Sequence, residues 1–370
     1  MSRIVHVCRT GWPAVGGLEA SVSGLARAQA ASGHQVEVVT LDRDAAGVRL
    51  HPCTDEGIVY RRLRRVGPRR YPVARGLIGA VCGAELIHVH GLDGLADVLV
   101  GVRRRHGVPV GISTHGGYFH TPRHRRLKQL WLRTVTRHTL SRADALWFTS
   151  ATDRDTLSVA LGRLPPEQRI LPDGVDVEAF AAVRRRPEAG RWLVPGRIDV
   201  HKGLGDLIRA LGHLAREDQR PFLVEITGRE RVVGLQRRLQ RLARGLGLGV
   251  AVRFVGQLDR AAMIAALGRA ELVLLPSRYE GFGIAAVEAM AAQVPIVVSE
   301  APALRAHVED GVTGFVAPFT DPVAAAEVIA GVRGRDHRAL ARRGAVAAQR
   351  HSWSARAAEV AAAYRALGVG

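Results

Sequence analysis

The sequence of 370 residues is poor in the residues that build disulfide frameworks, thiolate metal sites or membrane spans. Its three cysteines include no C-x-x-C pair, and no His/Asp cluster with metal-ligand spacing is apparent. No run of about 18 uncharged apolar residues occurs, so no membrane-spanning helix is predicted. The first residues, Ser2–Cys8, are too few and too polar for a signal peptide and are typical of a buried strand. We therefore expect a cytoplasmic protein with a metal-free mechanism.

Lysine is also scarce, because arginine supplies nearly all of the positive charge. The only lysines are Lys128 and Lys202, yet the formal net charge is +19. Much of this charge lies between Arg61 and Arg142, where seventeen Lys/Arg residues are accompanied by three acidic ones. A basic first half can bind nucleic acid, anionic lipid or an acidic substrate, and composition alone leaves these alternatives open.

Short β-branched apolar runs alternate with helical stretches along the chain. A first series runs from Ile4 to Thr149, and a second begins at Arg191–Val194 and continues to Ile296–Ser299. This alternation is typical of parallel sheets with crossover helices. We predict an α/β protein with two Rossmann-like domains, residues 1–182 and 183–352, in which the polar segment 181–190 is a linker.

The most informative motif is Glu280-Gly-Phe-Gly-Ile-Ala-Ala-Val-Glu288, between the strand-like run Leu272–Leu275 and the helix-like stretch Ile284–Gln293. A glycine-rich turn at a helix N-terminus leaves backbone N–H groups available for phosphate. One carboxylate lies in the turn and the other in the helix, so the pair can accept hydrogen bonds from a sugar and from a ribose. The alternative is a loop charge and a solvated helix charge. The N–H groups expected at the ligand belong to Gly281, Phe282, Gly283 and Ile284.

The strand, the E-x7-E spacing and the small-residue helix resemble the signature of retaining glycosyltransferases of family 4. The resemblance implies the GT-B fold, with two Rossmann-like domains facing across a cleft and a C-terminal helix, here 353–370, that crosses back to the first domain. It also implies that Glu280 contacts the donor sugar and Glu288 the ribose. Transfer with retention of configuration and no required cofactor are further implications.

A second motif, Gly196-Arg-Ile-Asp-Val-His-Lys-Gly203, places the two cations Arg197 and Lys202 around one turn. Fixed cations can stabilise the departing diphosphate of a nucleotide sugar without a metal. The G-R-x-x-x-x-K-G spacing resembles the donor-phosphate motif of the same family. Other nucleotide-sugar contacts are predicted at Gly16, Gly17, Gly228, Arg229 and Val255.

His115 lies in Ser113-Thr-His-Gly-Gly-Tyr-Phe-His-Thr121, after a strand of the first domain. It resembles the active-site histidine of family 4, which implies a contact with the transferred sugar. The long form of the motif resembles the α-mannosyltransferases that extend a polyprenyl-diphosphate-linked cellobiose in xanthan- and acetan-type exopolysaccharides. We therefore expect transfer of mannose from GDP-mannose to a lipid-linked oligosaccharide. The alternatives are a UDP-sugar-dependent glucosyl- or N-acetylglucosaminyltransferase and, outside the enzymes, a basic nucleic-acid-binding protein.

The segment Arg123–Leu140 combines an apolar stripe with clustered basic residues. A polyprenyl-diphosphate acceptor stays in the bilayer, so the enzyme must reach the membrane surface. We expect this segment to dock on the anionic inner face of the cell membrane, although an ordinary crossover helix that buries its leucines fits the pattern as well. The stripe comprises Leu127, Leu130, Trp131, Thr134 and Val135, and the nearby charges are Arg125, Arg126, Lys128, Arg133 and Arg137.

Overall fold

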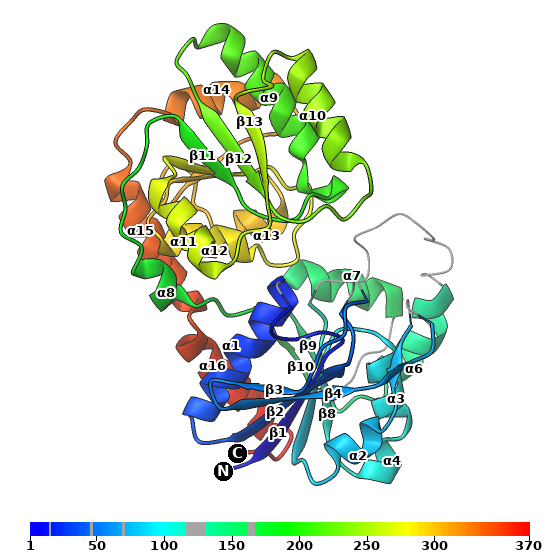
Figure 1. Cartoon of the computed structure of the whole chain (residues 1–370). Coiled ribbons are helices and arrows are strands. Elements are labelled where there is room, and N and C mark those ends of the chain that lie inside the picture. The colour runs from blue at the N-terminus through cyan, green and yellow to red at the C-terminus, as the bar shows by residue number, and fades with distance from the viewer. Residues whose placement is uncertain (15, 45–46, 69–70, 116–129, 162–166) are drawn as a thin grey trace. The chain divides into compact units, whose positions relative to one another are not determined.

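The computed structural model describes residues 1–14, 16–44, 47–68, 71–115, 130–161 and 167–370. The chain forms two compact units: unit 1 comprises Met1–Val175 and Trp353–Gly370, and unit 2 comprises Asp176–Ser352. Each unit is a largely parallel sheet with helices on its faces (Figure 1). The domain boundary expected at residues 182 and 183 falls inside unit 2.

The polar segment 181–190 is held to unit 2. The guanidinium of Arg185 donates to the carbonyl oxygen of Ala270 at 2.8 Å. The backbone N–H of Glu188 donates to the carbonyl oxygen of Arg269 at 2.9 Å. A charged segment packs in this way when its backbone groups find partners. The interpretation of 181–190 as a linker is therefore wrong.

Unit 1 has an eight-stranded sheet in which the edge strand β3 is antiparallel to β4 and the other pairs are parallel. Its central strands are runs of Val, Ile and Leu, because a parallel sheet is covered on both faces. In sheet order the strands are β10 (Glu167–Ile170), β9 (Ala145–Phe148), β8 (Val110–Ser113), β7 (Leu86–His90), β1 (Arg3–Val7), β2 (Gln35–Leu41), β4 (Ile58–Leu63) and β3 (Cys53–Asp55). The ribbon β5 (Arg65–Val66) and β6 (Val73–Ala74) is separate. The helices are α1 (Gly17–Ala31), α2 (Leu77–Val81), α3 (Gly94–Gly101), α4 (Arg103–His106), η1 (Leu132–Thr136), α6 (Arg137–Leu140), α7 (Ala151–Leu161) and α16 (Trp353–Arg365).

Unit 2 has a six-stranded, fully parallel sheet of the doubly wound type. In sheet order the strands are β13 (Val252–Gly256), β12 (Leu223–Thr227), β11 (Arg191–Val194), β14 (Leu272–Leu275), β15 (Ile296–Val298) and β16 (Phe315–Val316). The order reverses between β11 and β14, and ligands of such sheets bind outside the carboxyl ends of the strands at that point. The helices are α8 (Val177–Ala181), η2 (Val200–Lys202), α9 (Leu204–Glu217), α10 (Leu235–Gly245), α11 (Arg260–Arg269), α12 (Ile284–Ala291), α13 (Pro302–Arg305), α14 (Pro322–Val332), α15 (Arg338–Ala348) and η3 (Gln349–His351).

The last helix, α16, belongs to unit 1 and packs on α1, and the two termini are neighbours (Figure 1). Glycine at positions 24 and 174 makes this packing possible, because a Cβ at either residue would overlap the indole ring of Trp353. Near its other end, the hydroxyl of Tyr364 lies 2.7 Å from Nδ1 of His88 in β7. The C-terminal helix thus reaches the polar residues inside unit 1.

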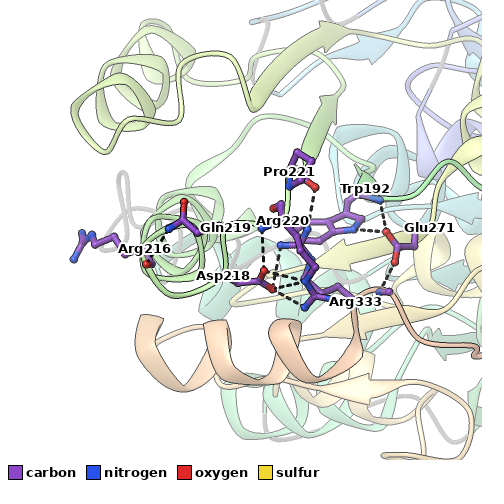
Figure 2. Close-up of polar contacts among 10 residues, drawn as sticks. Trp192, Arg216, Asp218, Gln219, Arg220, Pro221, Glu271 and Arg333 are labelled. Atoms are coloured by element: carbon purple, nitrogen blue, oxygen red, sulfur yellow. Dashed lines mark hydrogen bonds and ion pairs between the residues drawn. The ribbon is translucent and has the colours of Figure 1, made fainter.

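A buried arginine fixes the amino ends of the strands in unit 2, at the end of the sheet opposite the carboxyl edge (Figure 2). Arg333 donates to the carbonyl oxygens of Arg220 at 3.0 Å and Pro221 at 2.9 Å. Its guanidinium also stacks over Trp192, 5.1 Å from the ring centroid. Glu271 accepts a hydrogen bond from Nε1 of the same tryptophan at 3.2 Å. A planar guanidinium can stack and donate at once, so this network stabilises the end of the sheet that carries no predicted site residue.

The described part of the predicted membrane segment, residues 130–140, is helical and contains the π-turn η1. Leu130 is 60% exposed, Thr134 is exposed as well, and Trp131 and Val135 are half-buried, so none of these described residues of the predicted stripe is buried in the core. A π-turn closes i→i+5 hydrogen bonds, and its presence was not predicted from the sequence. Residues 123–129 lie outside the described residues. The buried side chains are Leu132, Thr136, Thr139 and Leu140.

In the parts of the chain that the structure describes, every helix is too short or too polar to cross a bilayer.

Candidate active site

Two of the predicted catalytic residues meet at the carboxyl edge of the unit 2 sheet. Lys202 ends η2 after β11, and Glu280 lies in the turn after β14, on the two sides of the switch point. The Nζ atom of Lys202 donates to Oε1 of Glu280 at 2.6 Å, and the Ser277 hydroxyl donates to the same oxygen at 2.7 Å. Both charged side chains are 14% exposed, so this ion pair is largely shielded from water.

The electrostatics of the turn keep Glu280 ionised. Burial alone would raise its pKa, but the Lys202 charge and the hydrogen bonds from Lys202 and Ser277 outweigh burial and hold the pKa below its usual value. Glu280 is therefore a hydrogen-bond acceptor at neutral pH, which is what a sugar hydroxyl requires. The sequence assigned Lys202 to the diphosphate and Glu280 to the sugar, and the structure joins the two side chains directly.

Sequence reasoning missed two neighbours of this pair, Ser277 and His201. Nδ1 of His201 lies 3.4 Å from Oδ1 of Asp199, which also caps η2. Burial lowers the pKa of His201, opposed by the negative charge of Asp199. Arg197 is exposed on the loop before η2 and adds its charge to the surroundings of His201. The loop after β11 therefore carries a cation at each end, as its sequence indicated.

Glycine is required where the loops of unit 2 touch. Gly203 has φ 65°, and a Cβ there would overlap the carbonyl oxygen of Pro276 before the Glu280 turn. Gly228 has φ 98°, and a Cβ there would overlap the carbonyl oxygen of Gly196. These are left-handed or related conformations that favour glycine. The close approach at Gly228 is therefore to the loop that carries Arg197.

The other predicted residues after β12 and β13 stay nearer the surface. Arg229 is exposed, and its carbonyl oxygen accepts a hydrogen bond from the N–H of Ile198 at 2.9 Å. Val255 is 38% exposed. Arg229 borders the Arg197 loop and Val255 lies in β13, and the nucleotide contacts expected of both residues stay predictions.

The turn before α12 is fixed by aromatic packing. Phe282 is buried, its carbonyl oxygen accepts from Nε2 of His307 at 2.6 Å, and its ring packs edge-on against His307 and His351. Gly283 follows with φ 93°, and α12 starts at Ile284 without a side-chain cap. The N–H of Ala286 donates to the carbonyl oxygen of Gly283 at 2.9 Å, and the anion contacts expected from the N–H groups before it stay a prediction.

Glu288 lies one turn further along α12 and differs from Glu280 in its electrostatics. Burial raises its pKa to about 7, opposed by the positive charge of Arg260. Arg260 also pairs with Asp176. The two glutamates of the motif are thus unequal, one ionised and one that titrates near neutral pH.

In unit 1, Gly16 is the N-cap residue of α1 and Gly17 its first residue, and no side chain caps this helix start. The carboxylate of Glu19 lies over Gly16 and accepts a hydrogen bond from the hydroxyl of Thr10. A negative charge at a helix N-terminus is favourable. The place that the sequence assigned to a phosphate is therefore filled by Glu19, and a diphosphate that binds there has to displace this side chain.

His115 follows β8 and has φ 48°, a conformation that is uncommon outside glycine. Its side chain is 9% exposed, Nδ1 lies 3.1 Å from Oδ1 of Asp173, and Nε2 lies 2.9 Å from Nδ1 of His90. Backbone strain of this kind clusters at functional sites. Sequence reasoning did not single out Asp173, because the polar strand β10 before it has no apolar pattern that would have placed it at this sheet edge.

Three histidines of unit 1 form a cluster that the sequence did not reveal: His6 of β1 with His88 and His90 of β7, whose ligand atoms lie within 4.8 Å of one another. Neighbouring strands bring them together, so no linear spacing predicts the cluster. A metal needs free nitrogen lone pairs at about 2.0–2.1 Å. The ring nitrogens are instead engaged with hydrogen-bond partners, such as His90 at 2.8 Å for His6 and Ser113 at 2.7 Å for His88. This donor set does not fit a metal ion.

Known proteins share this sequence and arrangement. Residues 15–179 match the model of Glycosyltransferase Family 4, and residues 178–335 match the model of Glycosyl transferases group 1. The GDP-mannose:cellobiosyl-diphosphopolyprenol alpha-mannosyltransferase of Xanthomonas campestris is 35% identical over 84% of this chain and 82% of that protein. The chain belongs to glycosyltransferase family 4. The protein of the same name from Komagataeibacter xylinus is 32% identical over 98% of this chain and 93% of its own length.

Membership of family 4 confirms that the chain is a glycosyltransferase and overturns the non-enzymatic alternative. Solved structures confirm the GT-B fold. Sucrose-phosphate synthase from Thermosynechococcus elongatus matches with a TM-score of 0.79 at 24% identity, covering 99% of each chain. Anabaena HepE in complex with UDP-glucose matches with a TM-score of 0.77 at 19% identity, covering 99% of this chain and 100% of that one. At such identities the likeness shows the fold alone.

Proposed function

We propose that this glycosyltransferase transfers mannose from GDP-mannose to a lipid-linked oligosaccharide, with retention of configuration, in exopolysaccharide or cell-envelope glycan synthesis. The observation that carries the proposal is the identity of 35% and 32% with two bacterial proteins whose names specify this donor and a cellobiosyl-diphosphopolyprenol acceptor. Both alignments span most of this chain and most of those proteins, so they include both units.

The site residues have distinct roles in this proposal. As the sugar–phosphate bond breaks, negative charge grows on the departing diphosphate, and Lys202 and Arg197 stabilise it. Glu280 accepts hydrogen bonds from the donor sugar, and Glu288 accepts them from the ribose. His115 acts at the reaction centre from unit 1. The 2.6 Å contact between Lys202 and Glu280 supports this assignment, because it holds a cation and a sugar acceptor side by side before the donor arrives.

The reaction in this proposal needs no metal and no dedicated base, because the departing phosphate accepts the proton of the attacking hydroxyl. A cation pair replaces the metal that many nucleotide-sugar enzymes need to neutralise the diphosphate. The N–H groups at the uncapped start of α12 add to that neutralisation.

We further propose that unit 1 docks on an anionic membrane surface at the inner face of the cell membrane, where a polyprenyl-linked acceptor is embedded. Leu130, Arg133 and Arg137 are exposed at three- and four-residue spacing along residues 130–140. An exposed leucine followed by basic side chains is the pattern of an interfacial helix, in which arginine heads meet lipid phosphates.

The proposed donor is tested by transfer assays with purified chain and a membrane-lipid extract that contains cellobiosyl-diphosphopolyprenol. Labelled GDP-mannose, UDP-glucose and UDP-N-acetylglucosamine are offered in parallel, with Lys202→Ala as the inactive control. We expect label to enter the lipid fraction from GDP-mannose. Transfer from a UDP sugar and none from GDP-mannose would replace the proposed donor by the UDP-sugar alternative.

A further inference from the structure

The imidazole of His307 holds a backbone carbonyl group of the turn that precedes α12. Its Nε2 atom lies 2.6 Å from the carbonyl oxygen of Phe282, and both residues are buried. His307 follows α13 in the connection between β15 and β16, whereas Phe282 follows β14, the strand that pairs with β15. The contact therefore joins two loops at the carboxyl edge of the unit 2 sheet, the same edge at which Lys202 meets Glu280.

The direction of this hydrogen bond follows from the groups that make it. A carbonyl oxygen accepts hydrogen bonds and has no proton to donate, so Nε2 of His307 must carry the proton. The neutral Nε2–H tautomer and the imidazolium both meet this requirement. The contact therefore places a proton on Nε2 whatever the charge of the ring.

The rings around Phe282 restrict it further. His307 and His351 each pack edge-on against the Phe282 ring, with centroids 4.7 and 5.2 Å away. The two imidazoles also pack edge-on against each other, with centroids 4.8 Å apart. Edge-to-face arrangements of this kind are favourable for aromatic rings. Phe282 is thus held at two points, its ring and its carbonyl oxygen, and His307 contacts both.

The carbonyl contact matters because the turn is built from glycine. Gly281 and Gly283 flank Phe282, and glycine permits backbone conformations that other residues resist. The peptide bond between Phe282 and Gly283 is trans and planar, so its C=O and its N–H point in opposite directions. A flip of this peptide would exchange the two directions. The hydrogen bond with His307 selects one of them, in which the N–H of Gly283 points away from the imidazole.

We propose that His307 is a positioning residue for the donor diphosphate, because its Nε2–H holds the Phe282 carbonyl group and thereby directs the N–H of Gly283 toward a phosphate oxygen. His307 acts only through the turn and does not touch the donor. The proposal rests on the proposed function, in which the N–H groups of this turn help to neutralise the diphosphate. A flipped peptide would present the carbonyl oxygen of Phe282 to the phosphate instead, and the two oxygens would repel each other.

Two substitutions of His307 separate this role from simple packing. In His307→Gln, the amide nitrogen of the longer side chain can reach the position of Nε2 and donate there. In His307→Asn, the amide lies near the position of Nδ1 and is too short to reach the carbonyl oxygen. Both variants replace the ring by a polar amide, so a difference between them reports the hydrogen bond. Denaturant unfolding shows whether each variant is folded.

A second histidine of unit 2 makes the same kind of contact away from the site. Nε2 of His337 lies 2.8 Å from the carbonyl oxygen of Val332, and its ring packs edge-on against Phe315 with centroids 5.0 Å apart. Phe315 begins β16, and Val332 precedes Arg333, which fixes the amino ends of the strands. His337→Asn therefore removes the same hydrogen bond from similar packing at the other end of the sheet, and it is the matched control.

Calorimetry of the full chain with GDP and with UDP measures the effect, and the variants are compared with the nucleotide that binds the native chain more tightly. We expect His307→Asn to weaken nucleotide binding about tenfold or more, and His307→Gln to weaken it by less than about threefold. His337→Asn should bind like the native chain. Native affinity in His307→Asn, or equal losses in His307→Asn and His307→Gln, would overturn the proposal.

NMR with ¹⁵N-labelled histidine tests the same contact in the native chain, with signals assigned from His307→Gln and His337→Asn. Nε2 of His307 should carry a proton, and this proton should exchange with solvent more slowly once the nucleotide is added, because a bound phosphate reduces opening of the turn. The Nε2 proton of His337 should be unaffected. If His307→Asn does not fold, this measurement decides. A missing Nε2 proton on His307, or exchange that the nucleotide does not change, contradicts the positioning role.

These outcomes are separate from those that test the proposed donor. Tighter binding of UDP than of GDP would contradict GDP-mannose as the donor. The comparison of His307→Gln with His307→Asn would then be made with UDP, and it would still decide the role of His307. If neither nucleotide binds the native chain, the positioning role is overturned as well.

Discussion

Replacing Lys202 by Ala should affect catalysis and folding through the same contact. Lys202 is one of the fixed cations assigned to the departing diphosphate, and loss of one such preorganised group costs about 2–4 kcal/mol of transition-state stabilisation. That range corresponds to a roughly 30- to 900-fold fall in kcat/KM. The same change leaves Glu280 in its buried turn with the Ser277 hydroxyl as its remaining hydrogen-bond partner in the described contacts.

The loss of unfolding free energy can be estimated from the Glu280 carboxylate, which loses its lysine partner. Removing one partner of a fully buried ion pair typically costs ~3–5 kcal/mol. Glu280 keeps the hydrogen bond from Ser277 and can take up a proton, so roughly 1–3 kcal/mol of unfolding free energy is the expected loss at neutral pH. The double variant Lys202→Ala/Glu280→Gln should recover part of this loss without recovering activity, because the buried charge is gone.

The loss should depend on pH with a definite sign. In the native chain the pKa of Glu280 lies below its unfolded value of 4.5, so the pairing stabilises the fold above that pH. This contribution is lost as pH falls through the folded pKa. In Lys202→Ala, burial instead disfavours the carboxylate, and protonation relieves the penalty. The difference in unfolding free energy between native and variant should therefore shrink as pH falls from 7 towards 4.

Denaturant unfolding across pH and steady-state transfer kinetics measure both effects. Arg209→Ala is the control, because Arg209 is an exposed cation on α9 whose partner Asp206 keeps a second arginine, Arg278. It should change stability by less than about 0.5 kcal/mol and leave turnover intact. Near-normal kcat/KM in Lys202→Ala would remove Lys202 from the mechanism. A stability difference that does not vary with pH would contradict the proposed coupling to Glu280.

Three further predictions follow from other parts of the structure. Glu288→Gln should weaken GDP binding in calorimetry and abolish the rise of GDP affinity with pH around 7, where the native Glu288 ionises. Glu280→Gln should leave GDP affinity unchanged and lower the transfer rate. Equal losses of GDP affinity in the two variants would refute this division of roles. Gly203→Ala should lower the unfolding free energy by roughly 2 kcal/mol or more. The control Gly234→Ala should lower it by about 1 kcal/mol, because Gly234 also has a positive φ but a Cβ there would meet nothing within 4 Å. Equal losses would show that the contact between Gly203 and Pro276 is unimportant. The chain should co-sediment with anionic but not with neutral vesicles, and salt should release it. The variant Arg133→Ser/Arg137→Ser should bind less than Arg238→Ser/Arg241→Ser on α10, which loses the same number of charges. Indistinguishable binding of the two variants would place the docking surface elsewhere.

The sequence predicted the elements whose residues carry an unambiguous pattern. The apolar runs of β11 and β14 have the same bounds in the structure as in the sequence analysis. The glycine-rich turn before α12 was also predicted from the sequence. By contrast, β10 reads Glu-Gln-Arg-Ile and lies at the sheet edge, where a polar strand is tolerated and the pattern carries no signal.

Contacts between distant parts of the chain could not be predicted from local patterns. Lys202 and Glu280 are 78 residues apart, and only the adjacency of β11 and β14 brings them to one turn. Asp173 was passed over because its neighbour His115 follows a different strand. The π-turn η1 was missed for a local reason, since no residue pattern in Leu132–Thr136 indicates it.

In both units a carboxylate lies beside a basic side chain of the predicted site. In unit 2 the ammonium of Lys202 is held by Glu280, and in unit 1 Nδ1 of His115 lies 3.1 Å from the carboxylate of Asp173, each pair having little exposure. A free buried cation would either lose its proton or recruit water, and both outcomes weaken its field at the moment of reaction. A carboxylate behind the cation prevents this and fixes the direction of the charge. Because preorganised charge is worth more than charge that must reorient, we expect Glu280 to be as necessary to the reaction as Lys202, the cation that it holds.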